Sequence, residues 1–428
     1  MKVQYKSRRR FLQGLGLLGV GLRASGAQLA RKSPRLPRLP IENVLICCNE
    51  NRTFDHYFGK APFVGPYGIP AGYTQPAGFP GLTVAPIDDD SPISPNPNHD
   101  WATIHGEWDS GKLDGFVTAG TVQAMTYTDA SQLSYYYSLF SEFTLCVNYF
   151  CSQLGPTFAN RLYLAGATSG GQTTDNVAAG SLDWPIILDL LDAHGITWKA
   201  YNIGGGCNVS TGPTAYYCDN QFQFFKRWVL DPRVNSFVDS DYYADLASGS
   251  LPQVSFVMTN DITGEHPPYP LNAGEALQQQ LIGALQESRY WPRAAYFLTY
   301  DEGGGFFDTV VPPVLDAYGA GFRVPTWVIS PFAKKSHLEP TIYEHSSLLK
   351  FVERVFDLPT LASVNHQFDT RTPGGSSNNA ANGGPFGPPA PPRDGRTDIG
   401  DMTECFEFNP EAGRQDLPPG FRTSSSSE

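Results

Sequence analysis

Three short apolar runs, each followed directly by acidic or polar residues, most constrain what this chain can fold into. The runs and the residues that follow them are 43–48 before Glu50-Asn51-Arg52, 294–300 before Asp301-Glu302, and 161–164 before Ala167-Thr168-Ser169. Short apolar runs of this kind predict buried parallel strands. In an open α/β sheet, ligands bind outside the carboxyl ends of the strands. We therefore expect the two acidic clusters and a hydroxyl to meet at one edge, which would be the active site.

Residues of these types, brought together, indicate a particular chemistry. Carboxylates and an amide oxygen are hard ligands for a divalent cation. A metal beside a hydroxyl lowers the pKa of that hydroxyl and neutralises charge on a transferring phosphoryl group. The combination predicts metal-assisted ester hydrolysis. Taken alone, a carboxylate just past a strand is more often a helix cap or a turn former.

The segment Glu50–Gly59 resembles the opening motif of the bacterial phosphoesterase family that contains secreted phospholipases C and a related acid phosphatase. Further matches follow in the family's order between about residues 41 and 360: His99-Asp100-Trp101 with His105, Gly111–Phe116, 148–161, Glu265–Pro268, Thr299–Asp308, Arg323–Pro325, 329–331 and Tyr343–Phe351. The chain departs from the family at Thr309, where members commonly have His, and at Asn49, where Gln is common. The first departure bears on substrate preference.

This resemblance implies a three-layer α/β/α fold that is alkaline-phosphatase-like, with a central, mostly parallel sheet and long loop insertions. It also implies a divalent metal cation and a Ser or Thr nucleophile. Carried over residue by residue, it suggests Glu50, Asn51, Asp301 and Glu302 as the metal site, Thr168 as the nucleophile with Ser169 as the neighbouring alternative, and His99, His105, His266 and His345 as contacts to the phosphoryl oxygens or the leaving group.

The composition of the chain divides it into three predicted segments. Residues 1–27 combine Ser7-Arg8-Arg9-Arg10-Phe11-Leu12 with a short apolar stretch, which is typical of a twin-arginine export signal. Residues 28–365 form the predicted catalytic domain, in which 60–98 is a long loop. Residues 366–428 are rich in Gly, Pro, Ser and Asn and predict a flexible or loosely wrapped tail.

Periodicity places further elements within the catalytic domain. Residues 183–195 predict a helix capped by Asp183, and 343–356 predict an amphipathic helix. Strands are expected at 196–201, 251–259 and 324–330.

Charge limits the partners. The formal charge is −12 for the whole chain and −18 without the six basic residues of the export signal. A surface so acidic repels nucleic acid and anionic lipid, so we expect no nucleic acid and at most transient contact with a membrane surface. A lipid substrate would be zwitterionic. The sequence leaves the oligomeric state open.

The sequence thus predicts a secreted phosphoesterase, periplasmic or extracellular, that acts on a phospholipid or small phosphoester. The favoured interpretation of the sequence is a phospholipase C that hydrolyses phosphatidylcholine-type diesters through Thr168. The enzymatic alternative is an acid phosphatase acting on monoesters. A non-catalytic secreted binding protein on the same scaffold is the alternative from another class.

Overall fold

The computed structural model describes residues 38–91, 93–204, 220–236, 238–365 and 390–408. The predicted export signal lies outside the described residues, as do 366–389 and 409–428 of the predicted tail. The unit from Leu39 onward contains all the elements below.

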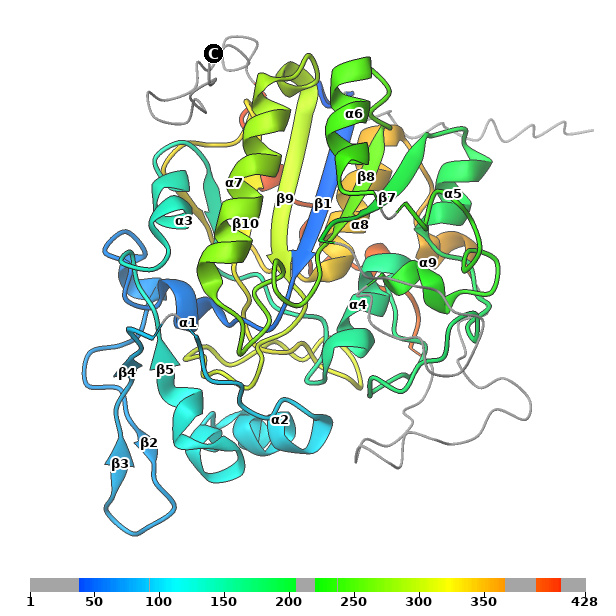
Figure 1. Cartoon of the computed structure of the whole chain (residues 1–428). Helices are drawn as coiled ribbons and strands as arrows, with labels where there is room; N and C mark the ends of the chain where they lie inside the picture. The colour runs from blue at the N-terminus through cyan, green and yellow to red at the C-terminus, as the bar shows by residue number, and fades with distance from the viewer. Residues whose placement is uncertain (1–37, 92, 205–219, 237, 366–389, 409–428) are drawn as a thin grey trace, which may run out of the picture. The chain divides into compact units, whose positions relative to one another are not determined.

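A seven-stranded sheet forms the centre of this unit (Figure 1). In spatial order its strands are β11 (His337–Glu339), β6 (Thr144–Cys146), β10 (Thr326–Ile329), β9 (Ala294–Tyr300), β1 (Asn43–Asn49), β8 (Val254–Met258) and β7 (Trp198–Asn202). Of these seven strands only β10 runs antiparallel to its neighbours. The strands β1 and β9 are buried along their whole length, because they are apolar on both faces of the sheet.

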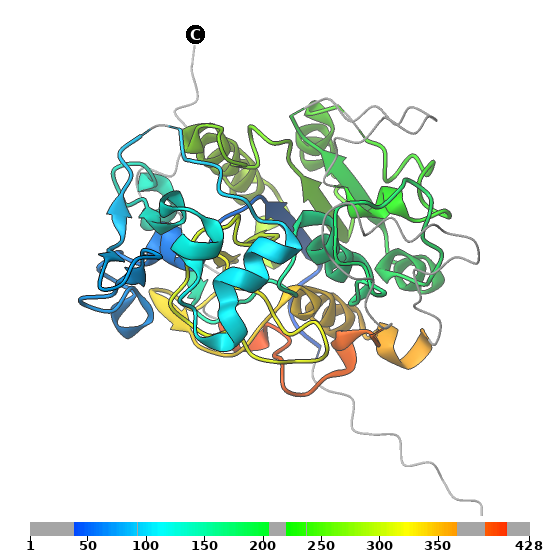
Figure 2. The ribbon, with the colours of Figure 1, turned by 90° about the horizontal axis from the view of Figure 1, so that it is seen from below.

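Helices cover both faces of the sheet (Figures 1 and 2). On one face α7 contacts α3 and α6, and on the other α4 contacts α5 and α8. These helices are α3 (Ser134–Leu139), α6 (Ser240–Ser248), α7 (Leu271–Glu287), α4 (Thr157–Gly166), α5 (Ile187–Ala193) and α8 (His345–Phe356). The predicted three-layer α/β/α fold with a mostly parallel sheet is confirmed.

The remaining elements lie in long connections. They are α1 (Phe54–Phe58), α2 (Trp101–Trp108), α9 (Leu361–Val364), and the short strands β2 (Gln75–Pro76), β3 (Thr83–Val84), β4 (Ile87–Asp88) and β5 (Thr126–Tyr127). The predicted loop at 60–98 contains only such short strands and one turn of 3₁₀ helix among its described residues.

One predicted strand is wrong. Residues 161–164 belong to α4. Every residue of α4 except Phe158 is buried, so the segment has no polar face that would mark it as a helix. A short apolar run without such a face does not distinguish a buried strand from a buried helix.

Two boundaries also differ from the prediction. The helix expected at 183–195 begins at Ile187, and the carboxylate that accepts a backbone N–H at its start is Asp189, from Ile186 at 2.9 Å, rather than Asp183. The predicted tail is wrong for residues 390–408, which pack against the domain. Arg393 is fully buried there, donates to Asp316 and lies over the ring of Tyr163.

Candidate functional site

The acidic clusters meet at the carboxyl ends of β1 and β9. These two strands pair in register up to Asn49 and Tyr300, so that Glu50 and Asp301 emerge side by side. The Asp301 Oδ1 accepts hydrogen bonds from the backbone N–H of Asn51 at 3.1 Å and of Glu302 at 2.7 Å. The side chains of this group are all buried: Glu50, Asn51, Asp301 and Glu302. The predicted convergence of the two clusters is therefore present.

The amide of Asn51 connects two histidines to this group. It lies 3.2 Å from Nε2 of His99 and 3.0 Å from Nε2 of His266. With its oxygen facing the histidines, its nitrogen donates to Glu302 at 2.8 Å and to Glu50 at 3.2 Å. The structure thus brings His99 and His266 to the acidic group.

Asn51 occupies the left-handed region of backbone space, with φ of 58°. A non-glycine residue there is strained unless its surroundings fix it. Gly304 provides the space, because a Cβ at that position would lie 2.5 Å from the Asn51 carbonyl oxygen. The tight approach of the two loops explains the glycines that follow Glu302.

Arg161 joins the two clusters from α4. Its guanidinium forms an ion pair with Glu50 and donates from Nε to Asp301 Oδ2 at 3.1 Å. The arginine and both carboxylates are almost completely excluded from solvent. Ion pairs of this kind are costly to break from one side, because each partner left behind is a buried charge.

The charges of the group fit a divalent cation. Three carboxylates (Glu50, Asp301 and Glu302) face one guanidinium, which leaves a formal excess of two negative charges. Burial, and next the charge of Asp301, raise the pKa of Glu302 well above its usual value. The oxygen donors are of the type that hard cations prefer. Among the described residues, however, no three His, Cys, Asp or Glu side chains already converge as a metal site, because Asn51 and Arg161 lie between the carboxylates.

The other two predicted histidines have different surroundings. His345 is fully buried at the start of α8, where its Nε2 lies 2.8 Å from the Asp301 carbonyl oxygen and its Nδ1 lies 3.2 Å from the Tyr149 hydroxyl. The contact with the Asp301 carbonyl oxygen holds the backbone of the Asp301 loop in place. His105 lies on α2, where its ring stacks on Trp101 at 3.8 Å between centroids. The contacts of His105 are with α2 itself and not with the acidic group.

The structure does not bring Thr168 to this group. Thr168 follows the C-terminal end of α4, and the helical rise places it about 10 Å beyond Arg161 along the axis. Its hydroxyl donates to the Ala390 carbonyl at 2.7 Å and accepts from the Gly170 N–H at 3.0 Å. Ser169 is buried at the same end of the helix. Both residues belong to the helix terminus, where Thr168 contacts the segment 390–408.

Another hydroxyl lies at the N-terminal end of α4. Thr157 is the first residue of the helix and is 7% exposed. It precedes Arg161 by four positions, so the two side chains share one face of the helix. The start of a helix also favours developing negative charge. Thr157 and Arg161 both lie in the matched stretch 148–161, whereas the predicted Thr168 lies downstream of that stretch.

Glu265, the residue before His266, has a buried carboxylate that holds this turn in place. Glu265 accepts hydrogen bonds from the hydroxyls of Tyr57 at 2.5 Å, Tyr300 at 2.6 Å and also Tyr136. Its backbone has a φ of 68°. Burial raises the pKa of Glu265, although the three hydroxyls oppose this. The anchored side chain fixes the turn from which His266 reaches Asn51.

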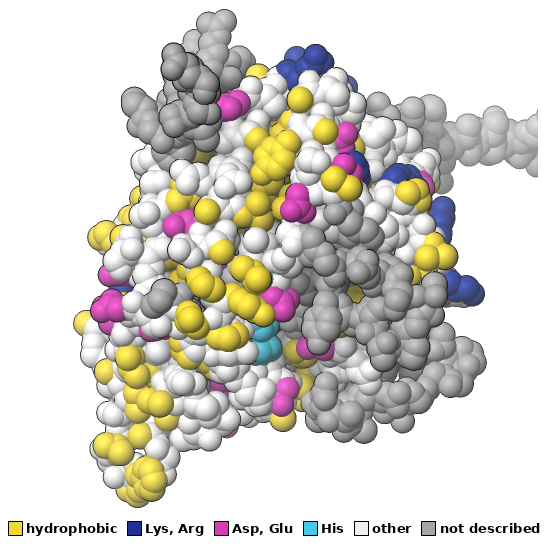
Figure 3. Space-filling model, viewed as in Figure 1, with side chains coloured by type: hydrophobic (Ala, Val, Ile, Leu, Met, Phe, Trp, Pro, Cys, Tyr) yellow, Lys and Arg dark blue, Asp and Glu magenta, His cyan; other side chains and the backbone are white. Residues whose placement is uncertain are grey.

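Figure 3 shows a small patch of exposed histidine beside acidic side chains. None of the helices in the described ranges has the length and apolar character needed to cross a membrane.

Known proteins are similar to this chain over most of its length. The chain is 28% identical to the non-hemolytic phospholipase C of Burkholderia pseudomallei over 88% of its own length and 61% of that protein. It is 30% identical to phospholipase C B of Mycobacterium tuberculosis, covering 74% of each chain. It is 29% identical to the hemolytic phospholipase C of Pseudomonas aeruginosa, of which it spans 53%. The chain therefore covers little more than half the length of the Burkholderia and Pseudomonas relatives.

Among solved structures, the chain is similar to a protein in the alkaline phosphatase superfamily from Vibrio parahaemolyticus, with a TM-score of 0.38 and 11% identity over 74% of this chain and 68% of that one. A sequence model of the Phosphoesterase family matches residues 41–359, which include the acidic group, Arg161 and all four predicted histidines. The chain belongs to the Phosphoesterase family.

Proposed function

We propose that this chain is a phosphodiesterase of the phospholipase C type that works through a threonine nucleophile, Thr157, beside a divalent cation. The relatives named phospholipase C support the reaction class. The observation that carries the assignment is the position of Thr157 on the same helical face as Arg161, whose guanidinium joins Glu50 to Asp301. This position replaces Thr168, whose hydroxyl is engaged at the other end of α4.

In the proposed reaction the Thr157 hydroxyl oxygen attacks phosphorus and loses its proton to solvent, and the bond from phosphorus to the leaving alcohol breaks. His266 donates a proton to the departing oxygen. Water then attacks phosphorus in the phosphothreonine and releases the phosphomonoester. Arg161 and the start of α4 stabilise negative charge near the phosphoryl group. Glu50, Asn51, Asp301 and Glu302 would hold the cation, which would supply Lewis-acid neutralisation of phosphoryl charge.

The test compares two threonines of α4 and its terminus. We expect Thr157→Ala to lower kcat on nitrophenyl-phosphorylcholine by about 10³-fold or more, because the covalent route is lost. Thr168→Ala is the matched control, which removes one buried hydroxyl, lowers stability by about 1 kcal/mol and keeps turnover. Mass spectrometry of the wild-type enzyme quenched during turnover should find phosphorylcholine attached to Thr157. Full turnover by a folded Thr157→Ala variant would refute the assignment.

The competing activity is that of an acid phosphatase. A phosphomonoester dianion favours extra cationic groups around it, but the described residues that line the cavity beside His99 include no Lys or Arg. This favours a diester with a single negative charge on its phosphoryl group. Faster hydrolysis of nitrophenyl phosphate than of nitrophenyl-phosphorylcholine would favour the phosphatase, and hydrolysis of neither would favour the non-catalytic binding protein.

We further propose export by the twin-arginine route to the periplasm or the outside of the cell, on the basis of residues 1–27. Replacing Arg8 and Arg9 by Lys should retain the protein inside the cell. Cell fractionation measures this, and unchanged export would contradict the proposed route.

A further inference from the structure

The hairpin formed by β2 and β3 carries large apolar side chains into solvent. Phe79 is 72% exposed and Leu82 is 56% exposed, and Figure 3 shows hydrophobic side chains gathered over these two strands and their turn. The sequence has no charged residue between Lys60 and Asp88, although 17% of the whole chain is charged. Exposed strands of soluble proteins are normally protected by charged side chains, lysine above all. This hairpin lacks that protection.

A tight turn holds the two apolar side chains at the end of the hairpin. The Leu82 N–H donates to the Phe79 carbonyl oxygen at 3.1 Å, with Pro80 and Gly81 between them. Gly81 has a φ of 76°, which matches the positive φ that a type II turn requires at its third residue, and proline is common at the second. The backbone of this hairpin tip, Phe79–Leu82, is therefore already ordered, which lowers the entropy that binding costs.

The base of the hairpin is fixed to the loop that carries the acidic group. The Tyr73 ring, just before β2, stacks on Phe307 at 5.8 Å between centroids and 19° between ring planes. Phe307 follows Glu302 in the loop after β9. Gln75 in β2 is buried, and its Nε2 donates to the Leu113 carbonyl oxygen at 2.6 Å. The hairpin is thus packed against the loop from which Glu302 extends.

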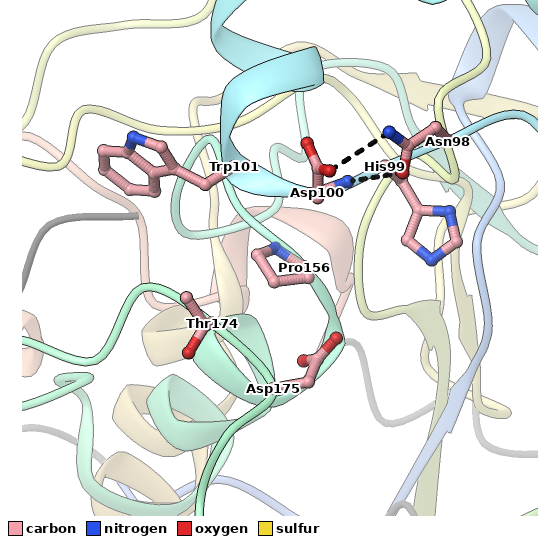
Figure 4. A pocket seen from close by; sticks show the side chains of 7 residues that line it. All are labelled: Asn98, His99, Asp100, Trp101, Pro156, Thr174 and Asp175. Carbon is pink, nitrogen blue, oxygen red and sulfur yellow. Dashed lines mark hydrogen bonds between the residues drawn. The ribbon is translucent and has the colours of Figure 1, made fainter. Parts of the chain in front are cut away.

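Helix α2 connects the hairpin to the proposed reaction centre. Residues 116–120 contact both β2 and α2. α2 begins at Trp101, which lines a cavity of about 280 Å³ together with His99 and Pro156, the residue before Thr157 (Figure 4). Figure 1 shows the hairpin and α2 at the same end of the domain, beyond the carboxyl ends of β1 and β9. A surface that touches the hairpin tip would lie at the end of the domain that carries the reaction centre.

We propose that the hairpin tip docks this protein on a lipid surface with zwitterionic headgroups, by inserting its apolar side chains between them. Binding to such a surface grows with the apolar area that the protein buries in it, and aromatic rings are favoured at the boundary between headgroups and hydrocarbon. The absence of charge from residues 61–87 suits a surface without net charge, whereas an anionic surface would repel a chain with a formal charge of −12. The proposal goes beyond the phosphodiesterase function, since docking is a separate step from the reaction.

The first experiment measures binding to a lipid that a phosphodiesterase cannot cleave. The sucrose-loaded vesicles consist of a phosphonate analogue of phosphatidylcholine, in which a methylene group replaces the glycerol oxygen on phosphorus. Centrifugation with the full chain separates bound from free protein and gives a partition coefficient. We expect Phe79→Ser combined with Leu82→Ser to lower this coefficient about tenfold or more, because the apolar transfer is lost. Phe79→Trp should retain binding, because tryptophan also favours the headgroup region.

Leu230→Ser is the matched control, because Leu230 is 73% exposed but lies outside the hairpin, next to the charged Asp231. It should leave the partition coefficient unchanged. The second experiment measures kcat/KM. The double hairpin variant should hydrolyse the soluble ester nitrophenyl-phosphorylcholine as the wild type does, and phosphatidylcholine in vesicles about tenfold more slowly. The melting temperature of each variant establishes that it is folded.

The outcomes separate docking from catalysis. An unchanged partition coefficient in the double hairpin variant would overturn the docking proposal, as would stronger binding of the wild type to vesicles that contain an anionic phospholipid. Analytical ultracentrifugation tests a second copy of the chain as the partner: a wild-type dimer that the double hairpin variant fails to form would assign the tip to that contact instead. Hydrolysis of neither substrate by the folded wild type would refute the phosphodiesterase function and leave the binding result standing.

Discussion

Two glycines in α7 should respond in opposite ways to the same substitution. A Cβ on Gly274 would lie 2.2 Å from Cγ and 2.6 Å from Oε1 of Glu265. A Cβ on Gly283, in the same helix, would meet nothing within 4 Å. Glu265 cannot simply move aside, because three tyrosine hydroxyls hold its carboxylate.

The expected magnitudes follow from these contacts. Alanine in place of glycine in a helix interior stabilises by about 1 kcal/mol, and Gly283→Ala should show this gain. Gly274→Ala receives the same gain but forces a displacement in a close-packed region, which costs about 1–3 kcal/mol, and weakens at least one hydrogen bond to a buried carboxylate, at about 1–3 kcal/mol. The net loss for Gly274→Ala is about 1–5 kcal/mol.

Urea denaturation of both variants measures the free energies of unfolding, and steady-state kinetics on nitrophenyl-phosphorylcholine reports on the site. Because Glu265 directly precedes His266, Gly274→Ala should also lower kcat, whereas Gly283→Ala should not. If Gly274→Ala were as stable and as active as Gly283→Ala, the rigid anchoring of Glu265 beneath His266 would be refuted.

Three further predictions concern charge. Arg161→Met should destabilise the fold by about 3–5 kcal/mol, because Glu50 and Asp301 would remain buried without their cationic partner; an unchanged melting temperature would contradict the described ion pairs. Removing divalent cations with a chelator should abolish turnover and lower the melting temperature, since a bound metal stabilises only the folded state; full activity after exhaustive chelation would exclude the metal. Burial, followed by the charge of Asp394, raises the pKa of Glu353 to about 10, from 4.5, so the folded state holds this proton more tightly than the unfolded state and stability declines as pH rises between these values. The melting temperature of Glu353→Gln minus that of the wild type should therefore increase from pH 5 to pH 9, and a constant difference would argue against a protonated Glu353.

The strands that position the acidic group could be predicted from sequence. β1 and β9 are continuous apolar runs with acidic residues directly after them, and the carboxyl ends of adjacent parallel strands necessarily lie together. The direction of β10 could not be predicted in the same way, because an apolar run carries no information on which way its strand points. Its antiparallel pairing with both β9 and β6 appears only in the structure.

The proposed nucleophile differs from the sequence-based prediction for a related reason. Once residues 161–164 were interpreted as a strand, the hydroxyls after them were expected at the active edge. Because the segment is a helix, the hydroxyl four residues before Arg161 shares a helical face with it, so we propose Thr157 in place of Thr168. The burial of α4 on all sides removed the periodic signal that would have shown this.

The contact between α4 and the segment 390–408 has a consequence for biosynthesis. The Arg393 N–H donates to the Ala167 carbonyl at 2.8 Å, and Ala390 accepts from Thr168. The C-terminal end of the helix that carries Arg161 is thus secured by amino acids that leave the ribosome more than two hundred residues after it. A nascent polypeptide interrupted before this segment would lack the hydrogen bonds that Ala390 and Arg393 form with the end of α4. The surroundings of α4 would therefore be completed only near the end of translation.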